Sequence, residues 1–275
     1  PRGATTTGDE PVLPSLSCEI APDDPTRLTL RIGYPVAPPP LSTLLPRLEH
    51  LGLLVLDCMR GQADTSERVF SCRRRLSGAV APDRASAAFT AVAAHALAGS
   101  AEDDAFNGLA WVAGLDVREI ALLRACARYL RQLGAPWSTD EIAAGLCAAA
   151  GFARGLVDLF ALRLSPAAAC ATRAAAAAAR LAAALDDVAP GELAQILRRC
   201  LALVEATVRS NWFQRDAAGQ PPPCIALKFD CARVEGMPAP RPWREIYVCG
   251  PHVEGVHLRG GAVARGGLRF SDRAR

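Results

Sequence analysis

Apolar and polar residues alternate with a period of two near the start of the chain, as in a half-buried strand. The apolar positions of this first predicted strand are Leu28, Leu30 and Ile32. Ser42 is placed to cap a short helix that continues to about His50, and a second strand is expected over 53–57. We interpret residues 25–60 as a strand–helix–strand unit, which is one half of a ferredoxin-like sandwich.

Between residues 85 and 215 the apolar positions recur every three or four residues, which is the spacing of one face of a helix. Asp116 and Ser138 each precede such a run, and both residue types cap helix N-termini. Residues 167–185 predict an alanine-rich helix. Pro190 opens the clearest helix, whose apolar stripe comprises Leu193, Ile196, Leu197, Cys200, Leu201, Val204 and Val208. The pattern indicates a helical, bundle-like domain.

The period of two returns after the proline-rich run that ends at Pro223. The alternating positions are Ile225, Leu227 and Phe229, then Ile246 and Val248, then Val256 and Leu258. We expect these strands to be poorly packed, because they would lack sheet partners. Taken with an irregular segment at 1–24 and a connecting segment at 61–84, the predicted fold class is α+β, mainly helical, with 216–275 starting a further domain.

Composition excludes several classes of protein. Hydrophobic residues make up 51% and charged residues 21%, which is typical of a globular chain. The net charge of +3 is too small to indicate a nucleic-acid partner, although the run from Arg73 to Arg75 leaves that alternative open beside a solvated face. The ten cysteines form no Cys-x-x-Cys pair, so we expect reduced thiols in a cytoplasmic protein, with no metal site. The least polar stretches are alanine-rich, so no membrane partner is expected.

Candidate chemistry concentrates near the C-terminal end of the sequence. Two Gly-Gly pairs lie among four arginines at positions 259, 265, 269 and 273. Glycine permits close approach of a ligand, and the arginine guanidinium suits carboxylates, so a dicarboxylate or amino-acid pocket is chemically sensible. The alternative is a pair of β-turns with arginines in solvent. His252 and His257 are candidate acids or bases, or hydrogen-bonded structural residues.

The stretch from Glu254 to Arg273 closely resembles the start of the catalytic domain in the large-subunit NAD-specific glutamate dehydrogenases. Residues 41–53 are similar to the last regulatory ACT-like unit of that family. Residues 105–109, 118–124 and 127–131 together resemble its helical region, and 206–214 resemble the segment before its catalytic domain. The four stretches occur in the same order as in the family.

This resemblance implies oxidative deamination of L-glutamate to 2-oxoglutarate and ammonia, in a cytoplasmic homo-oligomer. It implies these substrate-binding residues: Arg265, Gly266, Gly267, Arg269 and Asp272. The family's catalytic lysine is expected beyond Arg275, so no catalytic residue is predicted in this chain. NAD would be bound by a part of the parent protein that is not present here. Ala262 stands where the family commonly has lysine, which changes the local charge.

Two interpretations therefore stand at this point. In the first, the chain is an internal part of a glutamate dehydrogenase, and we expect it to be inactive by itself because it lacks the catalytic lysine and the nucleotide-binding fold. In the second, it is a regulatory or scaffolding protein derived from that family. The retained segment from Arg265 to Arg269 favours the first.

Overall fold

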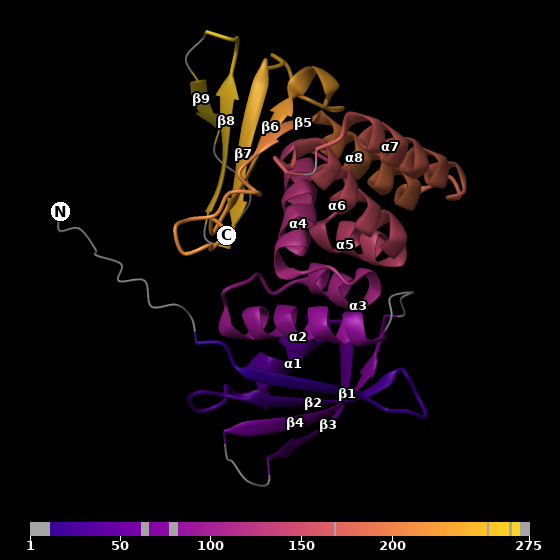
Figure 1. The fold of residues 1–275 in the computed structure, drawn as a ribbon, viewed down its shortest axis with the longest axis vertical. Coiled ribbons are helices and arrows are strands. Elements are labelled where there is room, and N and C mark those ends of the chain that lie inside the picture. Colours follow the sequence, from indigo (N-terminus) through magenta and orange to yellow (C-terminus); the bar gives the residue numbers. More distant parts are fainter. Residues whose placement is uncertain are drawn as a thin grey trace, which may run out of the picture.

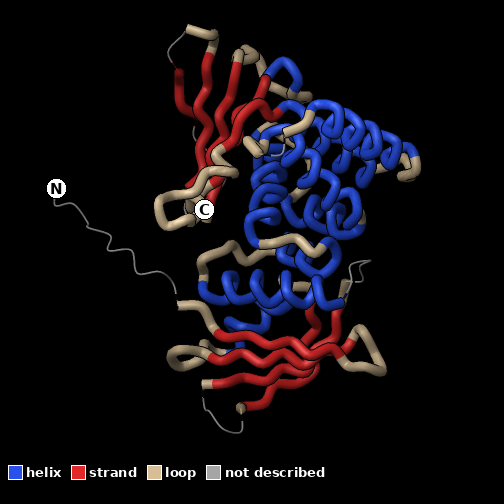
Figure 2. The backbone as a smooth tube through the Cα atoms, viewed as in Figure 1, coloured by secondary structure: helices blue, strands red, loops and turns tan. Residues whose placement is uncertain are grey.

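The computed structural model describes residues 12–61, 66–76, 82–167, 169–251, 253–263 and 266–269, with the backbone alone described at 82–85 and 266–269. Figure 1 shows three layers: an N-terminal sheet with two helices on one face, a group of helices in the middle, and a second sheet at the other end. The fold is therefore α+β, with helices between two antiparallel sheets (Figure 2).

The N-terminal layer is a four-stranded antiparallel sheet in the order β1-β2-β4-β3. Its elements are β1 (Ser15–Ile20), β2 (Arg27–Gly33), α1 (Leu41–His50), β3 (Leu53–Arg60), β4 (Glu67–Arg74) and α2 (Pro82–Ala98). Because β2 and β3 both pair antiparallel with β4, they run parallel to each other, with α1 joining them. This is the strand order of a ferredoxin-like sandwich, except that its edge strand precedes the unit in sequence.

The structure corrects the predicted organisation of this layer. Strand β1 lies within the segment predicted to be irregular, and β4 lies within the predicted connecting segment. The unit is thus a whole sheet, and not only a strand–helix–strand half. The helix α1 has Pro40 at its N-cap and no side-chain cap, so the prediction of a cap at Ser42 was wrong.

The middle layer contains η1 (Ala105–Gly108), α3 (Leu109–Ala113), α4 (Val117–Gln132), α5 (Thr139–Ala148), α6 (Ala150–Leu164), α7 (Ala171–Asp186) and α8 (Glu192–Ala206). The predicted caps at Asp116 and Ser138 are confirmed, each as a capping box with a glutamate three residues later. Helix α4 is central, because its buried residues contact helices on one side and the second sheet on the other.

The second sheet has the order β5-β6-β7-β8-β9, all antiparallel. Its elements are β5 (Thr207–Ser210), β6 (Ile225–Asp230), η2 (Cys231–Arg233), β7 (Arg244–Gly250), β8 (Val253–Arg259) and β9 (Gly266–Arg269). The prediction that these strands pack poorly was wrong. Leu227, Phe229 and Tyr247 are 0% exposed, because β6 and β7 pack on α4.

Two details of the sequence pattern also differ from the structure. Val208 was assigned to the apolar stripe of the last helix, but α8 ends at Ala206 and Val208 lies in β5, 41% exposed. In β7 the alternation of Ile246 and Val248 is present, but the face that packs against α4 is the other one, and it includes Glu245. Successive side chains of a strand point to opposite faces of the sheet, so the Glu245 carboxylate lies on the buried face of β7.

Candidate functional site

The predicted substrate-binding residues fall at the outer edge of the second sheet. Gly266 and Gly267 lie in β9 opposite Arg259 and Leu258, and Arg269 lies opposite Val256. Arg265 and Asp272 lie outside the described residues, as does His252. The structure therefore brings three of the five predicted residues together on one strand, and that strand follows a turn in which Arg259 donates to the Ala262 carbonyl at 3.0 Å.

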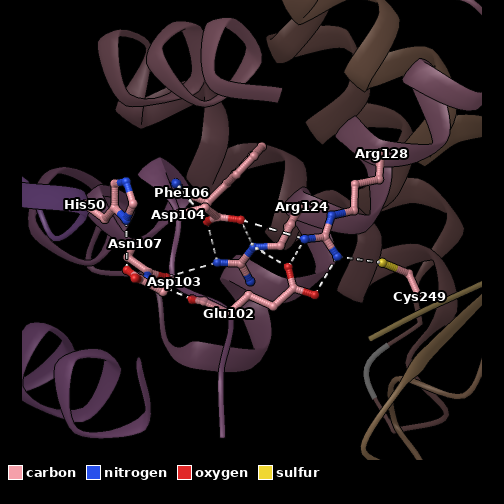
Figure 3. Close-up of polar contacts among 9 residues, drawn as sticks. All are labelled: His50, Glu102, Asp103, Asp104, Phe106, Asn107, Arg124, Arg128 and Cys249. Atoms are coloured by element: carbon pink, nitrogen blue, oxygen red, sulfur yellow. Dashed lines mark hydrogen bonds and ion pairs between the residues drawn. The ribbon is translucent and has the colours of Figure 1, made fainter. Parts of the chain in front are cut away.

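A second set of polar residues, which the sequence analysis did not single out, lies beside α4. We call it the α4 polar network, and it comprises Glu102, Asp104, Asn107, Arg124, Arg128 and Cys249 (Figure 3). Arg124 donates to both oxygens of Asp104, at 2.7 and 2.8 Å, and to Asn107 Oδ1 at 3.0 Å. Its side chain is only 4% exposed. A guanidinium this deeply buried requires such partners, because an unpaired buried charge costs several kcal/mol, about 3–5 when one partner is removed.

Arg128, one turn further along α4, extends the network to the second sheet. It forms a two-pronged ion pair with both oxygens of Glu102 and contacts Cys249 Sγ in β7 at 3.5 Å. Burial lowers the pKa of Arg128, but the hydrogen bonds and charge of Glu102 outweigh it and raise that pKa overall. Burial raises the pKa of the Cys249 thiol, against the opposing charge of Arg128. Arg128 thus stays charged and Cys249 stays a thiol.

The acidic segment that supplies Glu102 and Asp104 also reaches the N-terminal sandwich through Asp103. The Asp103 carboxylate lies 2.9 Å from His50 Nδ1 and 3.9 Å from Arg47 Nε, both on α1. Arg47 donates in addition to the Leu97 carbonyl at the end of α2, at 2.8 Å. Polar contacts therefore run from α1, through residues 102–104, to α4 and β7.

Two further contacts fix α4 to the second sheet. Tyr129 Oη donates to Glu245 Oε2 at 2.6 Å, and both residues are almost fully buried. Gln132 Nε2 donates to Glu254 Oε1 on β8 at 2.8 Å. One face of α4 thus positions β7 and β8, the strands that precede the predicted glycine–arginine segment. The sequence signal for this role was the acidic run at 102–104 together with arginines four residues apart on α4.

Other kinds of site find little support in the described part of the chain. Among those residues no group of three or more His, Cys, Asp or Glu side chains is arranged to hold a metal ion. None of the described helices is by itself long and apolar enough to cross a membrane; α5 and α6 meet that criterion only as a pair, by length and composition, and they are bent by 99° at their junction.

Family models match two parts of the chain. Residues 101–166 match "Glutamate dehydrogenase, helical motif 3", which includes the acidic segment and α4. Residues 180–275 match "Bacterial NAD-glutamate dehydrogenase, catalytic domain", which includes the whole second sheet. The two matches follow the order of the middle and C-terminal layers.

Three curated proteins, each called NAD-specific glutamate dehydrogenase, are similar to the chain. The protein from Halomonas elongata is 40% identical over 252 residues, which are 90% of this chain and 16% of that protein. The Pseudomonas aeruginosa protein is 44% identical over 184 residues, 65% of this chain and 11% of its own length. The Mycobacterium tuberculosis protein is 39% identical over 257 residues, 85% of this chain and 15% of its own length. The chain thus spans only 11–16% of the length of these relatives.

Proposed function

Because the chain belongs to the bacterial large NAD-specific glutamate dehydrogenases, of which it represents a helical motif and the start of the catalytic domain, we propose that it takes part in glutamate oxidation. The proposed reaction of the parent protein is oxidative deamination of L-glutamate to 2-oxoglutarate and ammonia, with NAD as the hydride acceptor. The observation that carries the proposal is the match of 101–166 to a glutamate dehydrogenase helical motif and of 180–275 to a glutamate dehydrogenase catalytic domain.

The proposed contribution of this segment to substrate binding is the glycine–arginine run that contains β9. Arg265 would hold a substrate carboxylate, with Gly266 and Gly267 allowing the ligand to approach the backbone. Arg269 and Asp272 would form the wall of the same pocket. Support comes from the residue types and from the placement of both glycines on the strand that ends the sheet.

The proposed role of α4 is to fix the strands that lead into this pocket. Substrate-binding groups need positions held within a fraction of an ångström, and rigid secondary structure supplies them better than loops do. Tyr129, Arg128 and Gln132 hold β7 and β8 from one helical face. The N-terminal sandwich, which we propose to be ACT-like and regulatory, contacts the same system through Asp103.

We propose that NAD is bound by another part of the parent protein. The 275 residues contain no Gly-x-Gly-x-x-Gly turn between strand and helix and no P-loop, which are the usual phosphate-binding sequences. A cytoplasmic location is proposed because all ten cysteines are free thiols, which suits a reducing compartment. A homo-oligomer is proposed from the family resemblance, and light scattering of the parent protein would test it.

A chimera tests the proposed function directly. The matching segment of the Pseudomonas aeruginosa relative is replaced by this chain, and glutamate-dependent NADH formation is measured. We expect an active chimera, in which Arg265→Gln raises the KM for glutamate about tenfold or more and leaves the KM for NAD unchanged. Arg265→Lys keeps the charge and should recover part of the loss.

Val263→Ala is the matched control, because Val263 is 95% exposed in the turn before β9. A folded chimera without glutamate-dependent activity would overturn the proposed reaction. An unchanged KM in the Arg265→Gln chimera would remove Arg265 from the pocket and leave the family assignment standing.

A further inference from the structure

A cavity of about 320 Å³ lies where the middle layer meets the second sheet. Its walls come from the start of α4, the segment after α2, the proline run at 221–223 and the end of β7 at Gly250. Its volume falls at the small end of the range for ligand pockets.

Most of the cavity wall is apolar. Val117 and Ala121 contribute from α4, Ile225 from β6, and the three prolines from the linker. An apolar wall favours a small ligand that can bury apolar surface against it. The polar side chains of the wall include two guanidinium groups, and they are those of His95, Ser100, Glu102, Arg118, Arg124 and Gln220.

One nitrogen of the Arg124 guanidinium group is not used in the hydrogen bonds of the α4 polar network. Its Nε and Nη2 atoms bond to Asp104 and Asn107, whereas Nη1 makes no hydrogen bond to any described residue (Figure 3). Because the side chain is 4% exposed and lines the cavity, a ligand there is the natural acceptor for an arginine N–H.

Arg118 contributes a second guanidinium group to the cavity wall. Its Nε and Nη1 donate to the carbonyls of Trp212 and Pro222, each at 3.1 Å, and Arg118 forms no ion pair with the described residues. Burial lowers its pKa and the charge of Arg215 lowers it further, against the opposing charge of Asp116. The carboxylate of Glu102 at the opposite wall is already held by Arg124 and Arg128.

We propose that this cavity is a binding site for a small organic carboxylate with an apolar body. The carboxylate faces Arg118 and Arg124, and the apolar body lies against Val117, Ala121 and the proline run. Such a ligand bridges α4 and the end of β7, so it stabilises the contact between the helical layer and the second sheet. Its binding can be measured without catalytic turnover, so the test does not depend on the proposed glutamate reaction.

Calorimetric titration of the 275-residue chain tests this site with two matched pairs of probes: isovalerate with isovaleramide, and benzoate with benzamide. We expect at least one carboxylate to bind at millimolar concentration and about tenfold more tightly than its neutral amide. Arg118→Gln should abolish that preference. Failure of both carboxylates to bind, or equal binding of acid and amide, would overturn the proposal.

A cavity-filling variant locates the binding. Ala121→Met keeps a good helix former and every charge but occupies the cavity, so it should weaken carboxylate binding about tenfold or more. Ala184→Met on the exposed face of α7 is the control and should bind as the unmodified chain does. Binding that survives Ala121→Met unchanged would place the ligand elsewhere and refute the cavity as its site. Circular dichroism of each variant checks that it is folded.

Discussion

Removing one hydroxyl group tests how the helical layer holds the second sheet. Tyr129→Phe deletes the donor to Glu245 Oε2, at 2.6 Å, and leaves the ring in place. That ring stacks on Phe229 with centroids 4.3 Å apart and tilts against Tyr247 at 5.2 Å. Phenylalanine keeps both ring contacts, so the substitution isolates the hydrogen bond.

The expected loss follows from the burial of both partners. Tyr129 is 0% and Glu245 is 1% exposed, so water cannot replace the lost donor. A hydrogen bond to a charged group contributes about 1.5–3 kcal/mol to the free energy of unfolding. For a chain of this size each kcal/mol shifts Tm by about 2 °C, so Tm should fall by roughly 3–6 °C.

The assay is urea unfolding together with hydrogen exchange of the β7 amides, which should lose protection first if the contact is local. Tyr34→Phe is the matched control, because the Tyr34 hydroxyl is buried and has no hydrogen-bond partner among the described residues. It should change stability by no more than about 0.5 kcal/mol. Equal losses in the two variants would refute the reasoning, and a cycle with Glu245→Gln would measure the coupling energy between Tyr129 and Glu245.

Three further outcomes are expected. Gly250→Ala should lower the free energy of unfolding in urea by about 1–2 kcal/mol, because the added Cβ would lie 3.1 Å from the Pro223 carbonyl oxygen. The control is Gly255→Ala on the adjacent strand, where an added Cβ meets nothing within 4 Å, so this variant should be neutral or stabilising. Equal effects of the two substitutions would contradict this reasoning. Burial lowers the pKa of His95 below 6.5, so the unfolded chain takes up its proton first as the pH falls. The stability that His95 contributes is therefore present above pH 6.5 and lost below it, and His95→Gln should flatten this part of the pH–stability profile. Burial raises the pKa of Cys200 to about 12, so a thiol reagent at pH 8 should label it only after unfolding, and rapid labelling of the folded chain would disprove its burial.

Local signals predicted the elements whose determinants are close in sequence. The capping boxes of α4 and α5 each lie within four residues, so the caps at Asp116 and Ser138 could be identified from spacing alone. Strand β4 could not, because charged residues such as Arg73 obscure its pattern. Its position between β2 and β3 depends on pairing with strands far apart in sequence, and no local rule supplies that information.

The same distinction applies to the candidate sites. The glycine–arginine run was visible because a contiguous motif carries it. The α4 polar network was not, because its partners lie 17–121 residues apart and pair only after the layers assemble. The inward position of Glu245 was missed for a related reason, since alternation in a strand identifies two faces without saying which one meets the core.

The junction between α8 and β5 has a mechanical consequence. The helix ends at Ala206 and the strand begins at Thr207, with no loop between them, and Thr207 Oγ1 donates back to the Leu203 carbonyl at 2.8 Å. Because no loop separates them, a rotation of α8 would also move β5, which is the edge strand of the second sheet. If the N-terminal layer moved and displaced α8, the displacement would therefore be transmitted directly to β5, because no flexible linker lies between this helix and this strand.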